Sequence, residues 1–142
     1  MSQQASKSKN ITQLIKDWLQ HEPERIRIRR HHIEDERIWR EIVTQDIFDA
    51  LERGKVTRIR ESDSTLIWQG KDQSERLLEL LCSLVSMKGV DTLFIQEAST
   101  LRVGTAYEPG VEDKQLKRQW LSDNPEFRIT PDGIVRKKGT KL

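Results

Sequence analysis

The sequence predicts an α+β fold in which a small antiparallel sheet packs on N-terminal helices. Apolar residues near the N-terminus recur at helical spacing, whereas those further along the chain alternate with polar residues as in strands. The predicted helices are separated from the run of strands, which is typical of α+β proteins. A length of 142 residues fits one domain, which we place at residues 10–111.

The N-terminal part is predicted to contain one amphipathic helix, over residues 10–20, as an appendage of this domain. Residues 1–9 are polar, and we expect them to be disordered. Asn10 is the expected N-cap, and Pro23 ends the helix. The apolar residues on one face of this helix are Ile11, Leu14, Ile15, Trp18 and Leu19.

A strand and two helices are expected next. Residues 25–30 alternate arginine with isoleucine, so the sequence predicts a strand with Ile26 and Ile28 toward the core. Residues 33–42 have helical spacing. Thr44 is the expected N-cap of a further helix that Gly54 ends.

The middle of the chain contains one ambiguous segment. Residues 56–60 and 65–68 are predicted strands joined by a Glu-Ser-Asp-Ser turn. The leucines within residues 72–87 fit helical spacing better than alternation, which favours a helix inserted in the sheet. A strand remains the alternative for this segment.

The last third of the chain is predicted to contain a hairpin of residues 92–96 and 101–107, followed by a short helix over 114–121. Two short strands within 127–136 are expected around the turn residues Pro131, Asp132 and Gly133. We interpret residues 112–142 as a basic C-terminal extension.

The distribution of charge favours a phosphate-rich partner. The net charge is only +2, but residues 25–30 contain four arginines and no acidic residue. Residues 114–142 have a local net charge of +5. Clustered cations attract nucleic acid at long range, although a solvated basic face is the commoner meaning of such runs.

Other classes of protein are disfavoured. The single cysteine, Cys82, forms no internal disulfide, which fits a reducing compartment. The N-terminal residues lack the apolar core of a signal peptide, and no apolar run approaches the roughly 20 residues of a membrane helix. We therefore expect a cytoplasmic protein without membrane contact. His31 and His32 are adjacent, which is poor spacing for a metal site, and we expect no cofactor.

Two motifs together resemble a known family. The stretch from Arg30 to Val56 contains His-His-Ile, a helical segment with arginines, and a second helix ending in Gly. Residues 103–109 read Val-Gly-Thr-Ala-Tyr-Glu-Pro. In this order they resemble the opening and the close of domain-of-unknown-function family 4258, over about residues 25–109.

The resemblance implies a fold related to the RelE, barnase and colicin group of small metal-independent ribonucleases, many of which are toxins of bacterial toxin–antitoxin pairs. It carries family positions onto His32, Arg40, Thr105 and Tyr107. Glu36 stands where the family has its first Arg, with Arg37 beside it. The implied activity is cleavage of RNA through attack by a 2′-hydroxyl.

These residue types suit that chemistry. His32 is the expected acid or base, Arg40 and Arg37 are phosphate clamps, and the hydroxyls of Thr105 and Tyr107 orient or donate. From strand alternation we expect Thr105 and Tyr107 on the same side as Val103. Each residue also has a structural interpretation, as a helix cap, a surface ion pair or a core aromatic. The expected RNA-binding cations are Arg25, Arg27, Arg29 and Arg102.

Three functions are therefore open. The first is a toxin-like endoribonuclease. The second is a catalytically inactive module of the same fold, which binds a protein partner, such as an antitoxin or complex subunit, or RNA in a bacterial or phage defence or mobile-element system. Glu36 and the amphipathic first helix favour it. The third is a regulatory nucleic-acid binder with salt-sensitive affinity.

Overall fold

The computed structural model describes residues 3–130 and 135–138, and the fold is α+β. The α-helices of this part of the chain are α1 (Gln3–His21), α2 (Thr44–Arg53) and α3 (Asp113–Asp123). The strands are β1 (Ile26–Ile28), β2 (Lys55–Arg60), β3 (Thr65–Lys71), β4 (Leu77–Ser86), β5 (Asp91–Thr92), β6 (Ala98–Tyr107), β7 (Phe127–Ile129) and β8 (Val135–Lys137). Short helical turns lie at Pro23–Arg25, His31–Glu36, Ile38–Arg40 and Ile95–Glu97.

The main sheet is mixed rather than wholly antiparallel. Its order is β1-β6-β4-β3-β2, with β5 also paired to β4. β1 runs parallel to β6, and the other pairs are antiparallel. The expected hairpin of residues 92–96 with 101–107 is wrong, because β5 pairs with β4 while β6 lies between β4 and β1.

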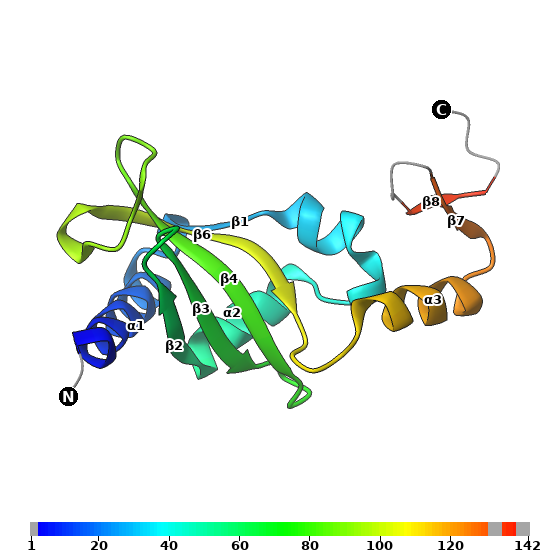
Figure 1. The fold of residues 1–142 in the computed structure, drawn as a ribbon, viewed down its shortest axis with the longest axis horizontal. Helices are drawn as coiled ribbons and strands as arrows, with labels where there is room; N and C mark the ends of the chain where they lie inside the picture. Colours follow the sequence, from blue (N-terminus) through cyan, green and yellow to red (C-terminus); the bar gives the residue numbers. More distant parts are fainter. Residues whose placement is uncertain (1–2, 131–134, 139–142) are drawn as a thin grey trace.

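The two long N-terminal helices cover one face of this sheet. Figure 1 shows α2 crossing behind β3 and β4 and α1 beside β2, while α3, β7 and β8 extend from the opposite end. The apolar side chains of α1 and α2 and the inner face of the sheet form one core. The most deeply buried members of this core are Ile11, Ile15, Ile47, Leu51, Leu66, Trp68, Leu78, Leu80, Leu84, Leu101 and Val103.

Helix α2 approaches the sheet closely at a glycine. A Cβ atom on Gly70 would lie 2.0 Å from the carbonyl oxygen of Ala50, so only glycine allows this approach. The indole of Trp68 donates a hydrogen bond of 2.8 Å to the same carbonyl. This contact fixes the distance between α2 and β3.

The predicted inserted helix is wrong, because residues 77–86 form the central strand β4. β4 pairs with β3 on one side and with β6 on the other, so its backbone groups are bonded to neighbouring strands. Leu78, Leu80 and Leu84 face the core, whereas Leu81 is half-buried on the opposite face. A strand with leucines on both faces has the near-continuous apolar run that we interpreted as helical.

The predicted helix over residues 33–42 is also wrong. The segment forms a π turn and a 3-10 turn instead, and Glu41 adopts a left-handed conformation with φ of 53°. Arg76 donates hydrogen bonds to the carbonyl oxygens of Arg40 and Glu41, at 3.2 and 3.0 Å. In a helix that continued, backbone amides further along the chain would donate to these two carbonyl oxygens. Here the side chain of Arg76 donates to them instead.

The ends of the helices differ from the sequence predictions. α1 begins at Gln3 rather than at Asn10, so described residues that we expected to be disordered are helical. α2 is confirmed, but Val43 rather than Thr44 is its N-cap, and the amide of Val43 donates to the carboxylate of Asp46. The helix over 114–121 is confirmed within α3, and β7 pairs with β8 as expected. The turn residues 131–133 and the final residues 139–142 lie outside the described residues. None of the described helices is long and apolar enough to cross a membrane.

Candidate functional site

A bulge in β6 places Thr105 and Tyr107 on the open face of the sheet. Cys82 pairs with Val103 and Leu81 pairs with Thr105, so Gly104 is an extra, unpaired residue. Val103 and Ala106 point into the core, and Thr105 and Tyr107 point away from the helices. The expectation that Thr105 and Tyr107 share the side of Val103 is therefore wrong.

Tyr107 contacts a carboxylate on the neighbouring central strand. Glu79 is the register partner of Tyr107, and the phenol donates a hydrogen bond to its side chain. Glu79 also accepts a hydrogen bond of 2.6 Å from the Nε2 atom of Gln69 on β3. Burial raises the pKa of Tyr107 to about 12, and Glu79 acts in the same direction, so the phenol stays protonated at neutral pH.

Arg40 reaches the same region from the turn before α2. Its Nη1 atom donates to the hydroxyl of Thr105 at 3.2 Å and to the carbonyl oxygen of Ala106 at 3.0 Å. The positive charge of Arg40 also acts on the phenol of Tyr107. Arg40, Thr105, Tyr107 and Glu79 therefore form one cluster, which we call the Tyr107 cluster.

The cluster includes a carboxylate from the C-terminal extension. The Nε atom of Arg40 lies 2.7 Å from Oδ1 of Asp113, and the indole of Trp39 donates to the same oxygen at 2.8 Å. Lys117 lies over the ring of Trp39, 4.5 Å from its centroid. Burial raises the pKa of Asp113, but the hydrogen bonds from Arg40 and Trp39 outweigh this and hold it below its ordinary value. Asp113 thus stays ionised and neutralises Arg40.

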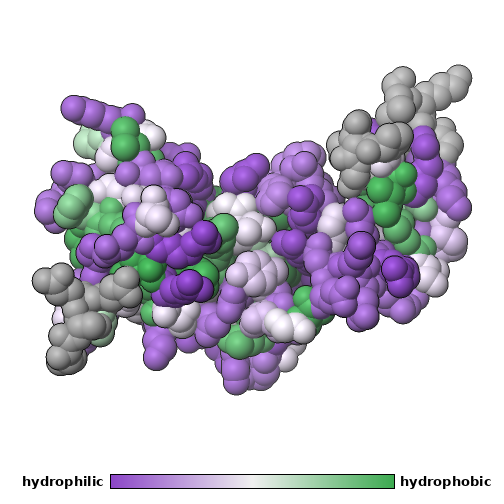
Figure 2. All heavy atoms as spheres, in the orientation of Figure 1, coloured by the Kyte–Doolittle hydropathy of each residue, from purple (hydrophilic) through white to green (hydrophobic). Residues whose placement is uncertain are grey.

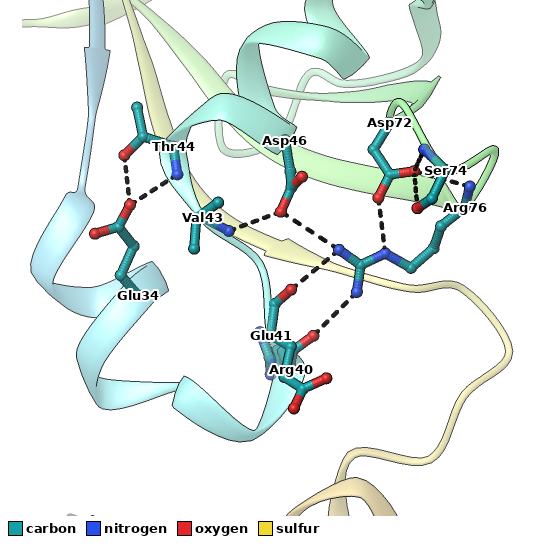
Figure 3. Close-up of polar contacts among 9 residues, drawn as sticks. All are labelled: Glu34, Arg40, Glu41, Val43, Thr44, Asp46, Asp72, Ser74 and Arg76. Carbon is teal, nitrogen blue, oxygen red and sulfur yellow. Dashed lines mark hydrogen bonds and ion pairs between the residues drawn. The ribbon is translucent and has the colours of Figure 1, made fainter.

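A network of buried polar groups holds the backbone of Arg40 in place. Figure 3 shows Arg76 between the carbonyl oxygens of residues 40 and 41 and the carboxylates of Asp72 and Asp46. Asp72 is only 2% exposed and accepts hydrogen bonds from Ser74 and from the backbone of Arg76. The turn between β3 and β4 therefore positions the segment that carries Arg40.

Glu34 anchors the other end of the same segment. Its Oε1 atom accepts hydrogen bonds of 2.7 Å from the amide and from the hydroxyl of Thr44, as Figure 3 shows. A carboxylate at the start of α2 also interacts favourably with the helix dipole. These bonds hold the pKa of Glu34 below its usual value. Thr44, which we expected to cap α2, instead ties α2 to the π turn.

His32 lies in a different group of charges. Its Nδ1 atom is 3.5 Å from Oε1 of Glu36, the residue that departs from the family pattern. Burial and the charges of Arg37 and Arg29 hold its pKa below 6.5, against the opposing effect of Glu36. Within the described part of the chain, no hydrogen bond or ion pair joins His32 to Thr105 or Tyr107. Its described contacts are therefore with Glu36, Arg37 and Arg29, and none of them is with the two hydroxyls of β6.

Arg37 lies between the two groups. Its charge acts on His32 and on Asp113, and its guanidinium lies 5.6 Å from the ring centroid of Trp39. It also donates a hydrogen bond to the backbone carbonyl of Glu36. Arg37 is thus placed to interact with either group, but its described contacts hold the turn.

The expected RNA-binding arginines have unequal roles. Arg27 and Arg102 are register partners on the open face, and Arg102 forms an ion pair of 3.0 Å with Asp91. Arg25 is half-buried, bonds to Glu22 and to the carbonyl of Ser99, and lies over the ring of Trp18. Arg29 is exposed. Arg25 is therefore mainly structural, and the other three lie where a ligand can reach them.

The open face carries further polar and basic groups that sequence reasoning missed. Figure 2 shows mostly hydrophilic side chains on this face, with hydrophobic patches among them. By strand alternation its residues from β2, β3 and β4 are Lys55, Arg58, Arg60, Thr65, Ile67, Gln69, Lys71, Leu77, Glu79, Leu81 and Ser83.

Two acidic residues of the cluster were missed as well. Glu79 had a signal in the sequence, because it is the one charged residue between Leu77 and Met87. Asp113 had none, because its partner Arg40 is remote along the chain.

Comparison of the chain with known proteins found no match: no protein-family model matches the chain, and no curated protein or solved structure matches it significantly. Among the described residues, no three His, Cys, Asp or Glu side chains are grouped as metal ligands. The interpretation of the site therefore depends on its geometry.

Proposed function

We propose that the protein is a toxin-like endoribonuclease that binds RNA on the open face of the sheet. The observation that carries this proposal is the Tyr107 cluster, in which a carboxylate, a protonated phenol and an arginine, all half-buried, meet on the open face of the sheet. Cleavage by 2′-hydroxyl attack needs a base, a proton donor and a cation at the phosphate. This cluster contains one residue suited to each role.

In the proposed mechanism Glu79 takes the proton of the 2′-hydroxyl, and the 2′-oxygen attacks the adjacent phosphorus. Arg40 binds the non-bridging oxygens as negative charge builds up on them. The bond from phosphorus to the 5′-oxygen breaks, and Tyr107 donates its proton to that oxygen. The products are a 2′,3′-cyclic phosphate and a 5′-hydroxyl, and proton return from Glu79 to Tyr107 restores the cluster.

The proposal assigns His32 a smaller part than the sequence suggested. Its neighbours are Glu36, Arg37 and Arg29, so we place it at the edge of the RNA-binding surface. The resemblance to family 4258 remains part of the proposal. The pairing of β1 with β6 supports it, because it brings the strand before His32 next to the strand of Thr105 and Tyr107.

The test is incubation of the protein with RNA in a metal chelator, followed by identification of the new ends. We expect 5′-hydroxyl and cyclic phosphate ends, and a loss of about 100-fold in rate for Tyr107→Phe and for Glu79→Gln. Glu24→Gln, an exposed change in a remote turn, is the matched control. A wild-type protein that cleaves no RNA, or variants with unchanged rates, would contradict the nuclease proposal.

A binding module without catalysis is the second candidate. The ion pair between Arg40 and Asp113 favours it, because a neutralised arginine is a weaker phosphate ligand. Under this alternative the protein binds a protein partner or RNA, and co-purifies with it without affecting growth. Binding of RNA by both wild type and Tyr107→Phe, with no cleavage by either, is the result that would select it.

A further inference from the structure

A basic groove runs between α1 and the outer edge of β2. Two adjoining cavities of about 660 and 540 Å³ make it up, and they share Thr12, Gln13, Lys55 and Thr57. β2 is the last strand of the sheet order, so this groove lies at an open sheet edge. Thr12 already accepts a hydrogen bond from the amide of Val56 on that edge, which leaves less room for an added strand.

The charged residues described in the lining of the groove are all positive. Its cations come from α1, from the end of α2, and from the end of the β2–β3 hairpin that is remote from its turn, and they are Lys9, Lys16, Arg53, Lys55 and Lys71. No Asp or Glu lines either cavity among the described residues. Polar side chains also line the groove, but those of Thr12, Gln13, Thr57 and Gln69 already donate hydrogen bonds within the protein, so the cations are its main groups for a ligand.

One carboxylate beside the groove restrains two of these cations. Glu75 lies 2.6 Å from Nη2 of Arg53 and 3.6 Å from Nζ of Lys71, and it does not line either cavity. Lys16 donates to the carbonyl oxygen of Glu52 near the end of α2. Lys55 is exposed and forms no ion pair within the described residues.

Gln69 joins the groove to the Tyr107 cluster. Its side chain lines the larger cavity and donates the hydrogen bond to Glu79. Lys55 is the register partner of Gln69. A polyanionic chain that extends from Glu79 toward the β2 edge of the sheet would therefore next contact Lys55 and Lys71. The positive lining thus continues directly from the proposed reaction centre.

We propose that this groove binds the phosphodiester backbone of the nucleic-acid strand that extends from the Tyr107 cluster. The inference deepens the proposed function and rests on it for the direction of the strand. Several cations along two cavities suit a repeated anion better than a single phosphate. Among the residues that the structure describes, the lining has few apolar side chains to anchor an acidic peptide and no aromatic ring on which a base would stack. Recognition is therefore of the backbone, in RNA and DNA alike.

The test measures binding apart from cleavage. A fluorescent 12-nucleotide 2′-O-methyl RNA, which has no attacking hydroxyl, and a DNA of the same sequence are titrated by anisotropy. We expect Lys16→Gln with Lys55→Gln to weaken binding of both strands about tenfold, and to reduce the salt slope by about 1.4 for two lost contacts. Lys88→Gln with Arg118→Gln removes two exposed charges elsewhere and should leave both values near those of wild type.

A second variant has the opposite expected sign. Glu75→Gln releases Arg53 and Lys71, so binding should become several-fold tighter. Unchanged affinity in both the lysine pair and Glu75→Gln would overturn the groove proposal, whether or not RNA is cleaved. A polyglutamate peptide that binds the wild type while neither nucleic acid does would overturn it in favour of an acidic protein partner. Loss of binding in the lysine pair, with no cleavage by wild type, would support the groove and reject the nuclease.

Discussion

The guanidinium Nε of Arg40 lies 2.7 Å from Oδ1 of Asp113, and this ion pair joins the first turn of α3 to the edge of β6. The extension after the sheet thereby occupies the arginine that the proposed mechanism needs for phosphate. An anion that binds Arg40 has to compete with Asp113, so under the proposed function we expect the extension to reduce the affinity of the site for RNA.

Asp113→Asn is expected to increase RNA cleavage and RNA affinity about two- to fivefold. The expectation follows because a partly exposed ion pair contributes roughly 0.5–1 kcal/mol, which binding to Arg40 would no longer have to overcome. Cleavage rates and anisotropy titrations measure the effect. Asp123→Asn, at the other end of α3, is the matched control. Reduced cleavage in Asp113→Asn would mean that Asp113 helps to position Arg40 for the reaction.

Tyr107 is expected to titrate with a pKa of about 12, above the ordinary value of 10.0. It is the one tyrosine of the chain, so tyrosinate absorbance near 295 nm reports on it alone. Burial and the hydrogen bond to Glu79 both favour the neutral phenol. The denatured protein should titrate near 10, and folded Glu79→Gln should titrate between the two values. A folded-state midpoint near 10 would show that the phenol is solvated and not bonded to Glu79.

Gly70→Ala is expected to lower the free energy of unfolding by about 3 kcal/mol or more. The new methyl group would meet the backbone of Ala50 at 2.0 Å, and backbone atoms of a packed helix cannot move aside cheaply. Urea denaturation measures the change. Gly104→Ala is the control, because its Cβ would approach its nearest neighbour only to 3.5 Å. Equal stability of the two variants would contradict the close approach of α2 to β3.

Asp72→Asn is expected to destabilise the fold by about 2 kcal/mol at neutral pH, because it removes the buried carboxylate that accepts from Ser74 and Arg76 and leaves the half-buried Arg76 only its longer ion pair with Asp46. Burial raises the pKa of Asp72, but hydrogen bonds from Ser74 and Arg76 bring it below 3.8. Because the pKa of Asp72 is lower in the folded state, the ionised carboxylate stabilises the fold at pH values above 3.8. This contribution is lost as the pH falls through the folded-state pKa. Denaturation at pH 7 and pH 3 should therefore show a smaller difference between variant and wild type at the lower pH. Asp17→Asn, an exposed change on α1, should follow the wild type at both values.

The sequence predicted the fold class, α1, α2, α3 and the β2–β3 hairpin because their patterns are local. Amphipathic helices and hairpins with polar turns are specified by neighbouring residues. The central strand β4 was not predictable in this way. It has leucines both on the face that the helices cover and on the open face, and only its pairing with β3 and β6 distinguishes that pattern from a helix.

The candidate site was predicted in part. Arg40 and Thr105 do meet, and Tyr107 lies with them, although on the face opposite to Val103. The described contacts of His32 are with Glu36, Arg37 and Arg29, beside or within the two turns that replace the expected helix. Glu79 and Asp113 enter the site through contacts between distant segments, which spacing along the chain does not reveal.

The extra residue at Gly104 decides which face of β6 carries the two hydroxyls. In a strand that kept Gly104 and alternated regularly from Val103, Thr105 and Tyr107 would share the buried side of Val103, and Ala106 would face solvent. The bulge shifts the residues after it by one position, so both hydroxyls reach the open face instead. A one-residue deletion at position 104 would therefore keep both hydroxyls on the open face, because Thr105 would then follow Val103 directly in the regular alternation.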